Sequence, residues 1–261
     1  MTRLTGRNPV PPPYSGAMSA GRILATDMDG TFLGDDPAMF RLWRLLEQAD
    51  ITLIFSTGRH LPAITSFYEE TGTARRARAC VCMVGTEIWH LADGGYEVDE
   101  GWSDVIADGW DRNAVADIVG AMPGTELQHD QWQSAFKSSW YLTDGAAEKL
   151  DRISQELEAR GLSAKIVYSA GRYLDLLPAR SGKGEAVRYL ARHLGAPPDD
   201  VVTAGDTGND LDMMRPELGF RGIAVGNSTE ELASFHAPNV YHARAPHAAG
   251  IEEGLRHYGW L

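Results

Sequence analysis

Short apolar segments that end abruptly in acidic, hydroxyl-bearing and glycine residues recur along this chain. The first, Arg22–Thr26 (RILAT), leads into DMDGT, and the second, Ile51–Phe55 (ITLIF), leads into STGR. Between them, Pro37–Gln48 places apolar residues at helical spacing. Strand, helix and strand in this order form a βαβ unit, which requires a parallel sheet covered by helices. The pattern therefore predicts an α/β protein.

The strand pattern stops after a third apolar run and resumes near the end of the chain. The third strand is predicted at Ala79–Val84, and later strands at Val201–Ala204, Gly222–Val225 and Asn239–Tyr241. Because the same pattern stands on both sides of a long interval, we expect a core that is split in sequence by an inserted segment.

The interval between the two groups of strands is richer in aromatic and polar residues. A strand is predicted at Ala135–Leu142, and a helix stripe runs from Ala146 through Leu150 and Ile153 to Leu157. Two more strand-like runs, at 163–168 and 172–176, flank a turn. This segment is predicted to be a small α+β insertion.

These patterns divide the chain into three parts. Residues 1–21 include four prolines and show no sustained hydrophobic period, so they are predicted to be a flexible leader. Residues 22–87 and 178–261 are assigned to the core, and residues 88–177 to the insertion.

Composition and charge exclude several classes of function. The 36 Asp and Glu residues outnumber the 24 Lys and Arg residues, and the resulting net charge of −12 argues against nucleic-acid binding. No stretch approaches the roughly 20 apolar residues of a membrane span, and the N-terminus lacks the apolar core of a secretory signal. We therefore expect a cytoplasmic protein that binds neither membranes nor nucleic acid.

The chain has two cysteines, Cys80 and Cys82, inside one predicted strand. Residues two apart in a strand point to the same side, so both thiols are expected on one face. No neighbouring His or Cys offers further metal ligands, and we interpret the pair as small buried apolar residues.

An acidic pair follows the first predicted strand. In extended backbone, Asp27 and Asp29 project to the same side, at the sheet edge where open α/β sheets bind ligands. Two carboxylates this close repel, which raises the proton affinity of one and allows the pair to divide nucleophilic and acid–base roles. The alternative is a calcium loop of the EF-hand type, but the glutamate required at its twelfth position is Ala38 here.

A second acidic cluster, GDTGND, follows the predicted strand Val201–Ala204. If this strand lies near the first in a parallel sheet, Asp206 and Asp210 face Asp27 across one crevice. Such an all-oxygen site suits a hard cation such as Mg²⁺. Taken alone, the cluster is equally typical of a polar turn, so the hypothesis depends on its pairing with DMDGT.

Two further motifs are suited to an anion. Ser56 and Thr57, followed by Gly58 and Arg59, offer hydroxyl and backbone N–H groups at the end of the second strand. Lys183 stands in SGKG directly before a predicted helix, whose N-terminus presents free amides. These elements are candidates for phosphate binding.

The order DMDGT, the threonine of STGR, a lysine and GDTGND resembles that of the haloacid dehalogenase-like phosphohydrolases, from about Arg22 to the end of the chain. The resemblance implies an α/β fold with a Rossmann-like parallel-sheet core and an inserted small α+β cap domain. It implies an aspartyl-phosphate intermediate, with Asp27 as nucleophile and Asp29 as acid and base. It also implies phosphate binding by Thr57 and Lys183, and Mg²⁺ binding by Asp27, the Asp29 backbone, Asp206 and Asp210.

Local phrases are more similar to the sucrose-phosphate phosphatases and the related mannosylfructose-phosphate phosphatases. They are FSTGRH, VGTEIW, QSAFKSSWY, DLLPARSGKG and GIEEGLRHYG. In these enzymes the cap closes over a sugar. By this resemblance, the sugar or the edge of the phosphate is contacted by Gly85, Thr86, Glu87, Gln133, Lys137 and Asn209.

The motifs and the resemblance together predict a Mg²⁺-dependent sugar-phosphate phosphatase, with sucrose-6-phosphate as the first candidate substrate and mannosylfructose-phosphate as the alternative. A phosphosugar mutase is possible on the same core, as is a catalytically silent sugar-phosphate-binding regulator. The mutually repelling pair Asp27 and Asp29 argues against a silent binder. We expect a small sugar phosphate as the partner, and a monomer or a complex with the cognate sugar-phosphate synthase.

Overall fold

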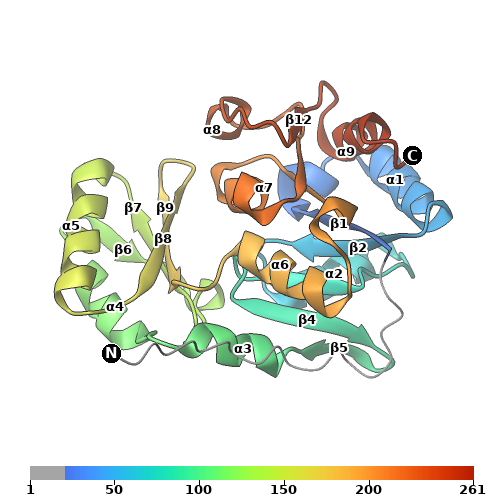
Figure 1. Cartoon of the computed structure of the whole chain (residues 1–261). Coiled ribbons are helices and arrows are strands. Elements are labelled where there is room, and N and C mark those ends of the chain that lie inside the picture. The colour runs from blue at the N-terminus through green and yellow to red at the C-terminus, as the bar shows by residue number, and fades with distance from the viewer. Residues whose placement is uncertain (1–20) are drawn as a thin grey trace, which may run out of the picture.

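The computed structural model describes residues 21–261, so the leader predicted for residues 1–21 lies, except for Gly21, outside the described residues. The larger of its two sheets has eight strands in the order β12-β11-β10-β1-β2-β3-β4-β5 (Figure 1). These strands are β1 (Arg22–Thr26), β2 (Ile51–Ser56), β3 (Ala79–Cys82), β4 (Glu87–Ala92), β5 (Gly95–Val98), β10 (Val201–Gly205), β11 (Arg221–Ala224) and β12 (Val240–His242). The predicted α/β core is confirmed.

All pairs from β12 to β3 are parallel, and helices cover both faces of this sheet. One face packs against α1 (Asp36–Gln48), α2 (Leu61–Thr71) and α9 (His247–His257). The other packs against α3 (Glu100–Ala107), α6 (Lys183–His193) and the short α7 (Leu211–Met214), while α8 (Glu230–Ala233) packs near β11 and β12. Because the parallel strands run one way, their polar loops gather at a single sheet edge.

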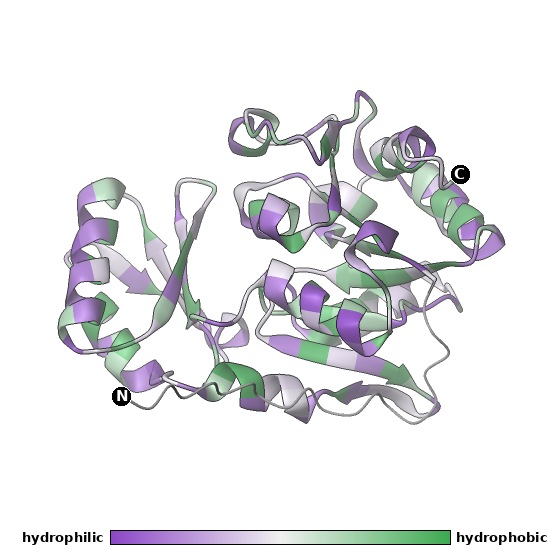
Figure 2. Cartoon of the chain, viewed as in Figure 1, coloured by the Kyte–Doolittle hydropathy of each residue, from purple (hydrophilic) through white to green (hydrophobic). Residues whose placement is uncertain are grey.

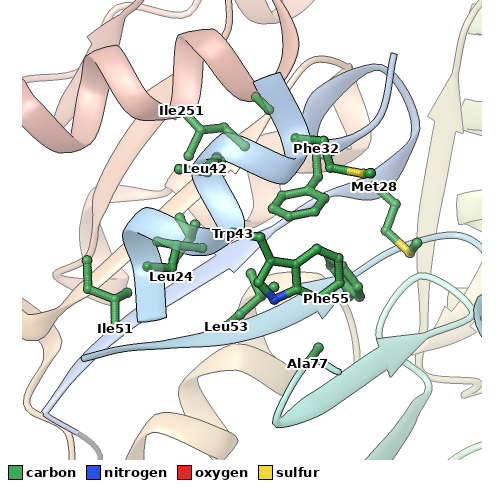
Figure 3. Packing of buried hydrophobic residues seen from close by; sticks show 14 of the residues in the cluster. Leu24, Met28, Phe32, Leu42, Trp43, Ile51, Leu53, Phe55, Ala77 and Ile251 are labelled. Atoms are coloured by element: carbon green, nitrogen blue, oxygen red, sulfur yellow. The ribbon is translucent and has the colours of Figure 1, made fainter. Parts of the chain in front are cut away.

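An aromatic cluster anchors the loop that follows β1. The Phe32 ring lies 5.2 Å from that of Trp43 and 5.1 Å from that of Phe55, in edge-to-face geometry (Figure 3). Phe32 and Met28 belong to the helical turn η1 (Met28–Phe32), and both side chains are fully buried. Burying two such side chains stabilises by roughly 2 kcal/mol each. The loop that carries the first acidic motif is thus anchored to the core by these two buried side chains.

The inserted segment forms a second unit with its own core. Its sheet has the order β6-β7-β9-β8 and is covered by two helices (Figure 1). Its elements are α4 (Arg112–Gly120), β6 (Thr125–Leu127), β7 (Ser138–Leu142), α5 (Ala146–Ala159), β8 (Ala164–Ser169) and β9 (Tyr173–Pro178). In Figure 2 the α5 ribbon carries both hydrophilic and hydrophobic colours, as an amphipathic surface helix should. We call residues 112–178 the insertion.

The boundary expected at residue 88 is a correction. Strand β4 pairs antiparallel with β3, and β5 pairs with β4, so both continue the core sheet. Helix α3 also belongs to the core, since Trp102 and Ile106 pack with residues of β1 and α6. The hairpin of β4 and β5 lies at the sheet edge and is only half-buried. This position explains its aromatic and polar residues, because of which it was predicted to belong to the insertion.

Within the insertion, the strand predicted at Ala135–Leu142 begins three residues later, at Ser138. A tight turn precedes it, in which the Ser134 and Lys137 backbones bond to one another. Cys80 and Cys82 are buried and point to the same face of β3, as predicted. Among the described residues, no helix has the length and apolar character needed to cross a bilayer.

A buried carboxylate fixes the end of the edge hairpin. Asp99, 1% exposed, accepts hydrogen bonds from the Trp102 amide at 2.9 Å and the Tyr189 hydroxyl at 3.1 Å, and it pairs with His90 Nε2 at 2.8 Å. Burial favours the neutral acid, but the bonds from His90 and the Trp102 amide outweigh it and lower the pKa of Asp99.

We predict that Asp99→Ala lowers the free energy of unfolding by about 2–4 kcal/mol, because it removes a helix cap and leaves buried donors without an acceptor. Since the pKa of Asp99 is depressed in the folded state, its contribution is present above the unfolded value near 3.8 and is lost as the pH falls below it. Urea titrations at pH 7 and pH 3 measure both effects. The exposed Asp93 supplies a control, and equal losses for Asp93→Ala and Asp99→Ala would contradict the prediction.

Candidate active site

Three of the predicted motifs follow neighbouring strands at one edge of the core sheet. Asp27 follows β1, Asp206 follows β10 and Thr57 follows β2, and β1 lies between the other two strands. The Asp27 amide donates a hydrogen bond to the Ala204 carbonyl at 2.9 Å. The structure therefore brings the early and the late acidic loops together, although they are far apart in sequence.

The glycine and threonine of DMDGT have a specific place in this contact. Thr31 Oγ1 donates a hydrogen bond to Asp206 Oδ1 at 3.0 Å. Gly30 has a φ of +79°, and a Cβ there would lie 2.3 Å from Asp206 Oδ2. Only glycine adopts this conformation without strain and leaves room for the carboxylate. These two residues thus set the position of Asp206.

Lys183 is the centre of the acidic cluster. Its ammonium donates to Asp27 Oδ1 and to Asp210 Oδ1, each at 2.7 Å, and its side chain is only 1% exposed. The second oxygen of Asp210 accepts hydrogen bonds from the amides of Asp206 and Thr207, each at 3.1 Å. Both Asp210 oxygens thus accept hydrogen bonds from donors within the protein. Asp27 and Asp206 each accept a side-chain hydrogen bond at Oδ1.

The cluster carries more negative charge than its lysine balances. Burial, reinforced by the charge of Asp210, raises the pKa of Asp27 to about 8, although Lys183 opposes the shift. Burial and Asp210 likewise raise the pKa of Asp206 to about 6. For Lys183, burial favours the neutral amine, but the charges of Asp210 and Asp27 outweigh it and raise the pKa. The site is therefore short of positive charge.

The residues present fit a hard divalent cation. Carboxylate oxygens of Asp27, Asp206 and Asp210 lie within 4.8 Å of one another, and all three residues are buried. Oxygen donors and a local excess of negative charge are what Mg²⁺ requires. No cluster of His and Cys ligands stands beside these carboxylates among the described residues.

Asp29 has surroundings opposite to those of Asp27. Its side chain is 61% exposed and is held by Arg59, which donates from Nε to Oδ2 at 2.8 Å and from Nη2 to Oδ1 at 2.5 Å. The sequence analysis quoted Arg59 as part of STGR but gave it no role of its own. A planar fork of two parallel bonds fixes the orientation of a carboxylate as well as its charge.

The predicted phosphate-binding residues Thr57 and Lys183 lie on either side of Asp27. Thr57 is 1% exposed, and its hydroxyl accepts a hydrogen bond from the Arg59 amide at 3.1 Å. That amide and the hydroxyl stand at the end of β2, next to the strand that leads to Asp27. Thr57 is thus brought beside Asp27 by neighbouring parallel strands, and Lys183 by its bond to Asp27.

A pocket of about 420 Å³ opens above this cluster, between the core and the insertion. The core side of its wall includes Asp27, Asp29, Thr57, Arg59, Asp206 and Asn209, and the insertion side includes Gln128, Trp132, Lys137, Tyr141, Tyr173 and Asp175. The Trp132 ring stacks on that of His60 in the core, with centroids 6.2 Å apart. The insertion therefore forms one wall of the candidate active site.

The six predicted sugar-contacting residues divide into two groups. Lys137 and Asn209 line the pocket. Lys137 is 4% exposed and lies 3.4 Å from Asp175, a residue the sequence analysis missed although it quoted the surrounding DLLPARSGKG. The Asn209 Oδ1 atom is buried and accepts no hydrogen bond from any residue between 21 and 261. Its contact with a ligand stays a prediction.

The other four residues do not line this pocket, and their contact with a sugar stays a prediction. The Gln133 side chain is occupied by the backbone, donating to Ser139 at 2.8 Å and accepting from its amide at 2.9 Å. Thr86 donates to the Met83 carbonyl, and Glu87 accepts from the indole of Trp89. Gly85 is packed against the backbone of Gly182, where a Cβ would lie 2.1 Å from a carbonyl carbon.

The fold and the site define the class of the protein. A parallel core sheet, an insertion over its loop edge and an acidic pocket between them are the plan of the haloacid dehalogenase-like phosphohydrolases. A family model described as Sucrose-6F-phosphate phosphohydrolase matches residues 20–259, so the chain belongs to this family.

Known relatives agree with this assignment. Mannosylfructose-phosphate phosphatase of Agrobacterium fabrum is 35% identical over 244 residues, which are 91% of this chain and 97% of that protein. Sucrose-phosphatase 1 of Nicotiana tabacum is 34% identical over 259 residues, 92% of this chain but only 60% of that longer protein. The structure of the Synechocystis sucrose-phosphatase, in complex with sucrose and phosphate, matches with a TM-score of 0.83 and 28% identity, covering 92% of this chain and 98% of that one.

We predict that MgCl₂ raises the melting temperature, because the cation should bind the folded protein where the three carboxylates converge, and the unfolded chain has no such site. At a concentration about 100 times the dissociation constant, the shift should be roughly 5–10 °C. Differential scanning fluorimetry with MgCl₂ and with EDTA measures it. Asp206→Asn should abolish most of the shift, and the exposed Glu47→Gln should leave it intact. An equal shift in the Asp206 variant would rule out this site.

Proposed function

We propose that the protein is a Mg²⁺-dependent phosphatase that hydrolyses the phosphate ester of a disaccharide, with sucrose-6-phosphate as the first candidate. The observation that carries this proposal is that Asp27 and Asp206, which line the pocket covered by the insertion, converge with the buried Asp210 and Lys183. Family membership supports the reaction class, and the names of the relatives support the substrate class.

In the proposed first step, a carboxylate oxygen of Asp27 attacks phosphorus and the bond from phosphorus to the sugar oxygen breaks. Asp29 delivers a proton to the departing sugar oxygen. In the second step, Asp29 accepts a proton from water, the water oxygen attacks phosphorus, and the bond to Asp27 breaks. Inorganic phosphate leaves, and both carboxyl groups return to their initial states.

The remaining residues hold the phosphoryl group and balance charge. Lys183 orients the Asp27 carboxylate, and with the Thr57 hydroxyl it would bind phosphoryl oxygens. Asp27, Asp206 and Asp210, with a contribution from the Asp29 backbone, would hold Mg²⁺, which supplies positive charge for the phosphoryl oxygens. Even with both cations the site stays negative, so backbone amides after Asp27 and Thr57 must donate as well.

The pocket walls support a polar ligand larger than phosphate alone. The volume of about 420 Å³ suits a disaccharide phosphate, and Trp132, Tyr141 and Tyr173 offer aromatic faces to sugar rings. Lys137, Asp175 and Asn209 add both donors and acceptors. Mannosylfructose-phosphate is the second candidate, favoured by the Agrobacterium relative that this chain nearly spans in full.

We also propose a setting for this activity. The acidic balance of the chain and the lack of a membrane-spanning helix among residues 21–261 agree with a free sugar phosphate as the partner. The cytoplasmic location, the monomeric state and a complex with the cognate sugar-phosphate synthase stay predictions.

Asp27→Asn should lower kcat by at least about 10⁴-fold, because the amide keeps the volume of the side chain but is no nucleophile. Far-UV circular dichroism should be unchanged. Release of inorganic phosphate from sucrose-6-phosphate with Mg²⁺ present measures the rate. Activity within tenfold of the wild type would exclude Asp27 as the nucleophile.

A screen of phosphorylated mono- and disaccharides should show kcat/KM for one disaccharide phosphate roughly 100-fold or more above that for phenyl phosphate, since polar pocket groups stay unpaired without sugar hydroxyls. Phosphorus NMR of the same reactions separates the alternatives. A mutase would give a new sugar phosphate in place of inorganic phosphate, and a silent binder would give neither.

A further inference from the structure

The two glycines of the SGKG motif, Gly182 and Gly184, pack closely against Asp212. A Cβ at Gly182, whose φ is +121°, would lie 2.5 Å from Asp212 Oδ2, and a Cβ at Gly184 would lie 2.1 Å from the Asp212 carbonyl oxygen. The Gly184 amide donates a hydrogen bond to Asp212 Oδ2 at 2.9 Å. Asp212 therefore lies against the first turn of α6 and contacts the residues before and after Lys183.

The other oxygen of this carboxylate is bound by the insertion. Lys165, on β8, donates from Nζ to Asp212 Oδ1 at 2.5 Å and to the Ser181 carbonyl at 3.4 Å. A Cβ at Gly182 would also lie 2.5 Å from this ammonium. One carboxylate thus joins a strand of the insertion to the turn that carries the active-site lysine.

We call the boundary between the core and the insertion the seam. The ion pair of Lys165 and Asp212 crosses it directly. A cavity of about 280 Å³ lies there, lined by Lys165, Asp212 and Lys183 among others, so apolar packing is incomplete. The side chains of Lys165 and Asp212 are 26% and 15% exposed, and a half-buried pair of this kind is stronger than a surface pair. The nearby pair of Arg180 and Asp108 is largely exposed.

We propose that Asp212 is a positioning residue that couples the seating of the insertion to the position of Lys183. By seating we mean the contact of β8 with the core. This inference rests on the proposed function, which gives Lys183 its role. When β8 is seated, Lys165 holds Asp212, and Asp212 holds the Gly184 amide next to Lys183. When β8 moves away, Asp212 loses its strongest partner from the insertion, and the turn carrying Lys183 loses that restraint.

Lys165→Met tests the seating without disturbing the fold. Asp212 keeps Arg215 at 3.4 Å, so no carboxylate is left unpaired. At low ionic strength we expect KM for the preferred disaccharide phosphate to rise about tenfold and kcat to fall about twofold, because the turn that carries Lys183 loses part of its restraint. For phenyl phosphate, which does not need the insertion wall, KM should change less than twofold, and kcat should fall by the same factor as for the disaccharide phosphate. Lys149→Met, on α5 of the insertion, makes the same charge change away from the seam and should have no effect.

Asp212→Asn tests the coupling. It removes the ionic bond and weakens the bond to Gly184, so it should raise KM like Lys165→Met and lower kcat further than that variant does, by several-fold on both substrates. The double variant should raise KM no further than either single variant, because both remove one interaction. Additive KM effects, or an unchanged kcat for Asp212→Asn on phenyl phosphate, would overturn the coupling.

A distance measurement judges the seating independently of catalysis. Cysteines introduced at the exposed positions Gln155, in the insertion, and Arg44, in the core, accept spin labels, while burial makes Cys80 and Cys82 unreactive. Lys165→Met should lengthen and broaden the distance distribution. An unchanged distribution would overturn the proposal even in an active enzyme. If the wild type releases no phosphate from any sugar ester, the proposed function fails, and the distances still decide the link.

Discussion

The Lys183 ammonium between two buried aspartates is the interaction around which the site is organised. It joins Asp27, at the end of the first strand, to Asp210, in a loop nearly two hundred residues later. Without it, three buried carboxylates would face each other, and burying uncompensated charge costs several kcal/mol per group. The lysine therefore allows the acidic loops to converge, while leaving a charge deficit that a divalent cation can fill.

The contrast between Asp27 and Asp29 shows how one motif provides two different groups. Met28 and Phe32 are buried in the core, so the chain between and after the aspartates is fixed. Asp27 lies beneath the pocket with a raised pKa, and Asp29 stands at its mouth, exposed and oriented by Arg59. A nucleophile needs a fixed position, whereas a group that exchanges protons with a leaving oxygen and with water needs access to both. Burial and the charged partner of each carboxylate, Lys183 for Asp27 and Arg59 for Asp29, thus give the two groups different surroundings.

Much of this could be predicted from the sequence because it depends on local patterns and on topology. Apolar runs ending at Thr26, Phe55 and Ala204 gave the parallel strands, and parallel strands bring their loops to one edge. Other features depend on long-range packing. The edge hairpin Glu87–Val98 has a strand pattern but no local sign of its partner, so it was assigned to the wrong unit. The bonds of the Gln133 side chain to the backbone could not be predicted either, because they depend on how the turn folds.

The seam between core and insertion follows a different physical rule from either unit. Each unit has its own apolar core, and the seam between them includes an ion pair, a ring stack, a pocket and the Phe136 side chain packed against the core. An extensive apolar contact would hold the two units together persistently, since its free energy scales with buried area and does not depend on a ligand. A seam in which polar contacts share the work with few apolar ones is held less firmly, so a ligand that bridges both walls can add a decisive share of the binding energy. A polar seam therefore makes the closed pocket depend on the substrate, which is what selectivity for a large sugar phosphate requires.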